Sequence, residues 1–197
     1  MQNKQLEELI LQALEHELGG VKVYETALAC VRNPELQTEW QRYLKETQTH
    51  VTSLTDVCSV IGLDASRETS GRKIVRHLGR ALVEAMNLAL SAGDPVAAEL
   101  VACECVVLAE TKDHLDWQLI GKCAERSPGL VAAALSSAYG VVEDQEDEHL
   151  YHTKGWCREL WLQSLGVPAV LPPPEEKRQV RTAIGAAKAE QAAEKER

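Results

Sequence analysis

A glutamate and a histidine three positions apart, Glu146 and His149, stand in the stretch from residue 141 to 152. In a helix such residues share one face, and Val142 before them and Trp156 after them place both on its apolar side. An isolated charge on a buried face is costly. A Glu-x-x-His pair that points into a helical bundle is how di-iron and di-manganese carboxylate proteins hold metal. The pair therefore predicts a metal site, the alternative being a solvated acidic face.

The first half of the chain offers further ligands. Glu17 lies inside an apolar stripe of helical spacing, and His50 flanks the next such stripe. The two residues lie at matching depth on either side of the break at Pro34. Thr47 stands three residues before His50, so the nearest carboxylate on that face is Glu46, four residues before it. We predict Glu17, Glu46 and His50 as metal ligands.

The third long helix holds several acids, among them Glu104, Glu110 and Asp113. Glu146 lies 18 residues after the break at Pro128, and Glu110 lies the same distance before it. Glu104 would be out of level with Glu146, because a helix rises by about 1.5 Å per residue. We predict Glu110 as the ligand from this helix, and Glu104 and Asp113 stay open as alternatives.

Each predicted ligand also has an interpretation without metal. Glu17 could pair with Lys22 or Lys45, and Glu110 could pair with His114 or Lys112 on the surface. His50 could be a neutral histidine packed in the core. We interpret His152 as a surface histidine. Tyr24, seven residues after Glu17, is interpreted as a core residue that could donate a hydrogen bond to a ligand.

Helices must position these residues. The 197-residue chain is long enough for one domain with a sizeable core, and its composition, rich in Ala, Leu, Glu and Gln, is that of an all-helical protein. Short breaks rich in Gly, Pro and Asn punctuate the apolar stripes. We predict an all-α fold, a four-helix bundle with a crossover helix between helices two and three. The predicted helices cover residues 4–32, 35–61, 72–91, 95–125 and 130–165.

The chain changes character after Gly166. Four prolines between residues 167 and 174 exclude a helix there, and the residues that follow are rich in Ala, Lys and Glu. We predict a bundle domain over residues 1–166, and a Pro-rich extended segment with a charged tail over residues 167–197. The tail is either a solvated helix or mobile.

Charge and hydropathy exclude several classes of function. The chain has 30 acidic and 21 basic residues and a net charge of −9, with no basic stripe for nucleic acid. Its longest uncharged run is too short for a membrane helix, and the first residues lack the apolar core of a signal peptide. The six scattered cysteines suit reduced thiols. We expect a cytoplasmic protein with no nucleic-acid or membrane partner.

The predicted metal ligands and their spacing resemble those of a known protein superfamily. Glu17 with Tyr24, the histidine of the second helix, the acid of the third and Glu146-x-x-His149 resemble the ferritin-like superfamily of rubrerythrins and bacterioferritins. The resemblance is closer for the stretch from residue 43 to 54, which looks like the second helix of small bacterial stress-associated ferritin-like proteins. The resemblance covers roughly residues 5–165. It implies a ferritin-like bundle with a dinuclear iron or manganese site, in a homodimer.

One departure from this resemblance concerns the number of ions. Thr47 stands where most of the superfamily has a bridging glutamate, which leaves an incomplete site as an alternative. We predict a non-haem, dinuclear metal-binding protein, an oxidoreductase in iron or peroxide handling with a small-molecule oxidant as its partner. The alternative is a metal-free helical structural or interaction protein that works through its C-terminal extension.

Overall fold

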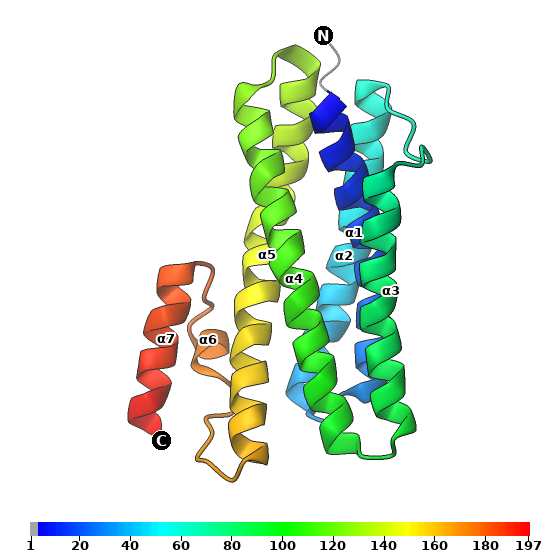
Figure 1. Ribbon diagram of the computed structural model, residues 1–197. Coiled ribbons are helices and arrows are strands. Elements are labelled where there is room, and N and C mark those ends of the chain that lie inside the picture. The colour runs from blue at the N-terminus through cyan, green and yellow to red at the C-terminus, as the bar shows by residue number, and fades with distance from the viewer. Residues whose placement is uncertain (1–3) are drawn as a thin grey trace.

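Seven helices and no strand make up the computed structural model over the residues that it describes, 4–197 (Figure 1). The predicted all-α class is therefore confirmed. The first three residues of the predicted bundle domain lie outside the described range. The helices are α1 (Lys4–Cys30), α2 (Pro34–Ile61), α3 (Ser70–Ser91), α4 (Pro95–Arg126), α5 (Gly129–Ser164), α6 (Pro174–Lys177) and α7 (Ala183–Glu196).

Local sequence signals set the helix ends. The side chain of Asn33 caps α2 by accepting hydrogen bonds from the first backbone N–H groups, and Pro34 occupies the first helical position. Gly62 ends α2 with a φ of 70°, a left-handed conformation that favours glycine. Asp94 and Pro95 start α4 in the same way as Asn33 and Pro34 start α2. The breaks fall within two residues of their predicted positions.

The long helices run side by side (Figure 1). α1 packs against α2, α3 and α4, and α5 packs against α4 and α2. α3 packs against α1 and α4. The apolar side chains of α1, α2, α4 and α5 form two separate core clusters, one toward each end of these helices. The level between the two clusters is where the polar ligands were predicted.

Glycines allow α1 to approach two neighbours closely. A Cβ on Gly19 would lie 3.9 Å from the Cα of Gly79 on α3, and one on Gly20 would lie 3.3 Å from the Cγ2 of Thr47 on α2. The second distance is tighter than ordinary van der Waals contact. Glycine in the middle of a helix costs about 1 kcal/mol relative to alanine. Gly19 and Gly20 allow this close packing of α1 against its neighbours.

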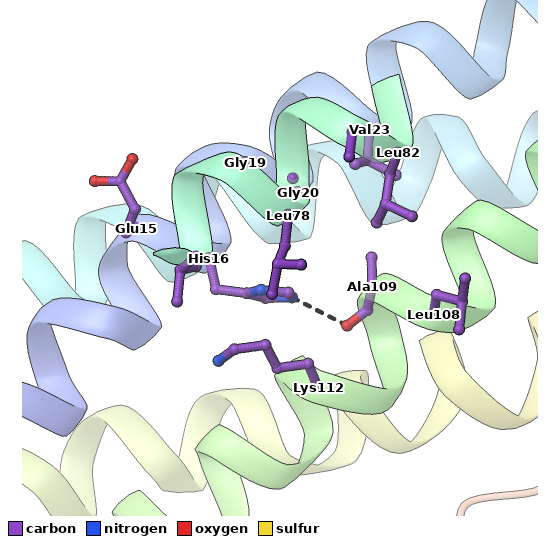
Figure 2. Close-up of a pocket in the computed structure, with 13 residues that line it drawn as sticks. Glu15, His16, Gly19, Gly20, Val23, Leu78, Leu82, Leu108, Ala109 and Lys112 are labelled. Atoms are coloured by element: carbon purple, nitrogen blue, oxygen red, sulfur yellow. Dashed lines mark hydrogen bonds between the residues drawn. The ribbon is translucent and has the colours of Figure 1, made fainter. Parts of the chain in front are cut away.

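An apolar cavity of about 280 Å³ lies between α1, α3 and α4 (Figure 2). His16 reaches across from α1, and its Nε2 lies 3.0 Å from the carbonyl oxygen of Ala109 on α4. Because a carbonyl oxygen only accepts, Nε2 carries the proton. Burial, with a smaller contribution from the charge of Lys112, lowers the pKa of His16 to about 4. The imidazole is therefore neutral at pH 7.

We expect His16 to make the fold sensitive to acid. In the unfolded chain its pKa returns to about 6.5, so stability is lost as the pH falls below that value toward 4. Between pH 7 and 4.5 the loss from this group is roughly 2–3 kcal/mol. His16→Gln keeps an N–H donor for Ala109 but does not titrate. Between pH 7 and 4.5, the free energy of unfolding measured in urea should fall by that much less in the variant than in the wild type. Equal decreases in the two proteins would contradict the prediction.

The C-terminal segment folds back onto α5. Residues 165–173 contain no helix, as predicted for the Pro-rich stretch, and α6 and α7 both contact α5. Glu175 accepts hydrogen bonds from both terminal nitrogens of Arg158, at 2.7 and 3.0 Å. The charged tail forms the helix α7, with Ala189 and Ala193 buried, rather than the mobile alternative. No helix within residues 4–197 is long and apolar enough to cross a membrane.

Candidate metal centre

A layer of buried polar side chains separates the two apolar core clusters. All four helices α1, α2, α4 and α5 contribute to it, and every member is at most 5% exposed. In α1, for example, the layer falls between Leu14 of one cluster and Val23 of the other. Its members are Glu17, Thr47, His50, Glu110, Asp113, Glu146 and His149.

Two groups of three potential metal ligands lie within this layer. Glu17, His50 and Glu146 form one, and Glu110, Glu146 and His149 form the other. In each group the ligand atoms all lie within 4.8 Å of one another. Glu146 belongs to both, so the two groups are one cluster that joins the α1–α2 hairpin to the α4–α5 hairpin.

Outer hydrogen bonds orient both histidines of the cluster. The Nε2–H of His50 donates to the amide oxygen of Gln145, and that of His149 donates to a carboxylate oxygen of Glu46, each at 2.8 Å. These acceptors carry no proton of their own, so each Nε2 must be protonated. The Nδ1 atoms then face the cluster, 3.0 Å (His50) and 3.4 Å (His149) from Oε1 of Glu146. This arrangement is typical of metal-binding histidines.

The inward-facing atoms lack hydrogen bonds. Among residues 4–197, neither Nδ1 of His50 or His149 nor either carboxylate oxygen of Glu146 has a hydrogen-bond partner, and the same holds for Oε2 of Glu17 and of Glu110. Several lie close to one another, but their alignment is too poor for hydrogen bonds. A buried polar atom left unpaired costs about 1–3 kcal/mol. Cations among these converging atoms would satisfy them, so the donor set fits metal.

The two outer acids are held by donors from the opposite hairpin. Trp117 on α4 donates its Nε1–H to Oε1 of Glu17 on α1, at 2.7 Å. Tyr24 on α1 donates its hydroxyl to Oε1 of Glu110 on α4, also at 2.7 Å. The other oxygen of each acid, Oε2, has no hydrogen-bond partner among the described residues. The hydrogen bond that Tyr24 was expected to be able to donate therefore reaches Glu110, one of the predicted ligands.

Burial and neighbouring charges shift the pKa values within the cluster. Burial raises the pKa of Glu17 to about 7 and raises that of Glu110. Burial also opposes ionisation of Glu146, but the imidazoles of His149 and His50 outweigh it and lower the pKa of Glu146. Glu17 and Glu146 in turn raise the pKa of His50 to about 10, against the effect of burial. Without metal the imidazoles hold protons, which metal ions must displace.

The structure brings together five of the six predicted ligands and places the sixth outside them. Glu46 belongs to neither group: it accepts from His149 and also pairs with Arg42 at 3.3 Å. The reason is helix geometry, because the position three residues before His50, which faces the cluster, belongs to Thr47. Glu46 therefore orients His149 instead of joining the groups.

The alternatives on α4 are also separated by the structure. Glu104 is exposed, whereas Glu110 and Asp113 are buried. Oδ1 of Asp113 has no hydrogen-bond partner in the described part of the chain. Burial, together with the charge of Glu146, holds the pKa of Asp113 well above its usual range. Asp113 thus lies at the edge of the cluster as a further buried acid, outside the two groups of three.

Sequence reasoning missed two supporting residues and misplaced a third. Trp117 lies seven residues after Glu110, so shared helical facing could have identified it as a donor. Gln145 precedes Glu146 and gives no signal of its own. The interpretation of His152 as a surface histidine is wrong, since it is only 3% exposed.

The fold and this cluster define an all-helical protein with a buried carboxylate–histidine layer between two apolar cores. No family model, no curated protein and no solved structure matches the chain. The argument for function therefore rests on the residues themselves.

Proposed function

We propose that the chain is a ferritin-like four-helix-bundle protein that holds two divalent metal ions, iron or manganese, in the buried cluster. The observation that carries this proposal is Glu146, which belongs to both groups of ligands. One ion would be held by Glu17 and His50 and the other by Glu110 and His149. In this proposal α3 is the crossover helix between the hairpins.

The donor chemistry supports hard or borderline ions. Carboxylates suit iron and manganese, and imidazole nitrogens suit iron. When bound, such a pair supplies redox chemistry toward a small oxidant such as dioxygen or peroxide. The chain itself orients the ligands through Trp117, Tyr24 and Glu46, and its apolar cores exclude water from both ends of the layer.

Thr47 distinguishes the proposed site from a symmetric one. Glu146 stands three residues before His149 on α5, and Thr47 stands three residues before His50 on α2. Its hydroxyl donates to the carbonyl oxygen of Tyr43, at 2.9 Å, instead of acting as a carboxylate ligand. The proposed centre therefore has a single shared carboxylate. The homodimer stays a prediction, because the structure holds a single chain.

Metal content tests this proposal. After anaerobic loading with ferrous iron, and separately with manganese, elemental analysis should find close to two ions per chain in the layer, as in dinuclear carboxylate bundles. His50→Ala and His149→Ala should each lose about one. His77→Ala is the matched control, because His77 is exposed on α3. A metal content that neither cluster variant changes would contradict the proposal. No bound iron or manganese after either loading would also contradict it and would favour the metal-free structural alternative.

A further inference from the structure

A second group of potential ligands lies where the C-terminal segment meets the long helices. Glu39 on α2, His152 on α5 and Glu176 on α6 place one ligand atom each within 4.8 Å of one another. The two acids lie far apart in the sequence, so only the docking of α6 brings them together. The group shares no member with the cluster described above.

His152 is the buried member of this group. Its Nδ1 lies 3.3 Å from Oε1 of Glu176 and 3.3 Å from the hydroxyl of Tyr43. Within the described residues its Nε2 has no hydrogen-bond partner. Nδ1 thus has a hydrogen-bond partner in Tyr43, whereas the buried Nε2 is not satisfied by the protein alone.

Charge also favours a cation at this place. Glu39 and Glu176 bring two carboxylates together, and like charges at this distance repel. Arg42 offsets part of this repulsion through its pair with Glu39 at 2.8 Å, but it also pairs with Glu46 and Glu148. A divalent ion between two carboxylates and a neutral imidazole would balance their charge.

Solvent reaches the group through an open pocket of about 470 Å³. Glu39 and Glu176 line this pocket together with Trp156 and Pro172. Trp156 donates its Nε1–H to Oε1 of Glu176, at 3.0 Å, and so fixes the carboxylate. An ion therefore has an access path and an oriented ligand, both of which a metal site requires.

From these observations we propose that Glu39, His152 and Glu176 bind a third divalent ion, of the zinc type, which fastens α6 to the long helices. Zinc binds both imidazole nitrogens and carboxylate oxygens, and three protein ligands leave a fourth position for water. Calcium and magnesium prefer oxygen ligands alone. This site shares no ligand with the first cluster. Tyr43 lies between them, with its ring centroid 4.2 Å from that of His149 and its hydroxyl 3.3 Å from Nδ1 of His152.

Zinc binding to the full-length, metal-stripped chain tests the proposal. Glu176→Gln should bind one zinc ion per chain fewer than the wild type. Glu35→Gln is the matched control, because Glu35 lines the same pocket but lies outside the group, and it should bind as many ions as the wild type. Equal zinc content in the wild type and Glu176→Gln would overturn the proposal.

A second variant leaves all three ligands in place. A Cβ on Gly155 would lie 2.7 Å from Oε2 of Glu175 and 3.0 Å from the Cβ of Pro173, so Gly155→Ala should displace α6. It should also lose one zinc ion. In limited proteolysis, zinc should protect the chain beyond Gly166 in the wild type but not in Glu176→Gln, and equal cleavage with and without zinc in the wild type would contradict the fastening role.

The same assay separates this site from the proposed dinuclear centre. A variant with both His50→Ala and His149→Ala should keep the one zinc ion that Glu176→Gln removes. If that ion persists while iron and manganese never bind in the layer, only the proposed function fails. If zinc binds the layer but Glu176→Gln changes nothing, only the third site fails.

Discussion

Glu146→Gln is expected to abolish metal binding in the polar layer, whereas Glu17→Gln and Glu110→Gln should each lose about one ion. The reason is that, among the described residues, Glu146 alone belongs to both groups of ligands. An amide keeps the size of the side chain but loses the negative charge and replaces one of the two oxygens by an NH2 group. Elemental analysis after manganese loading measures this difference directly, and loss of a single ion in Glu146→Gln would contradict the shared role.

The same substitution should destabilise the metal-free protein. Glu146 stays ionised there, because His50 and His149 outweigh the cost of burial. Removing one partner of a buried ion pair typically costs about 3–5 kcal/mol. Urea unfolding of the stripped protein measures this cost. Glu143→Gln is the control, since Glu143 is exposed on the same helix about one turn earlier, and it should change neither stability nor metal content.

Local signals were sufficient to predict the helices and the depth of the site. The caps at Asn33 and Asp94 act on the first turn that follows each of them, so the sequence alone locates them. Once the breaks are known, residues at equal distance from a break must lie at the same level of a hairpin. That is why Glu110 could be chosen over Glu104, which the structure shows to be exposed.

Contacts between distant segments could not be predicted in the same way. Glu46 and Thr47 differ by one position, and the packing of α2 decides which of them faces the layer. His152 is buried, with Glu176 of the C-terminal segment against it. The residues near His152 in the sequence do not indicate that this segment covers it. The pairing of Gln145 with His50 likewise depends on how α2 and α5 pack.

Thr47→Glu should make stability depend strongly on metal. Thr47 is 2% exposed and shares a face with His50. A carboxylate there would join Glu17 and Glu146 in the layer, and burying it without a cation should cost the stripped protein about 3–5 kcal/mol. Bound ions would neutralise it. We therefore expect manganese to raise the unfolding temperature of Thr47→Glu by more than it raises that of the wild type.

Thr47→Gln separates charge from size in this experiment. Both variants must fit beside Gly20, where the two helices already approach closely, so both carry the same steric cost. Only the glutamate brings a negative charge to the ions, and only its loss of stability should be reversed by manganese. If Thr47→Glu and Thr47→Gln are equally destabilised without manganese, and again equally destabilised with it, position 47 does not face the ions. A larger gain in Thr47→Glu than in Thr47→Gln would instead show that the layer has room for a second shared carboxylate at position 47.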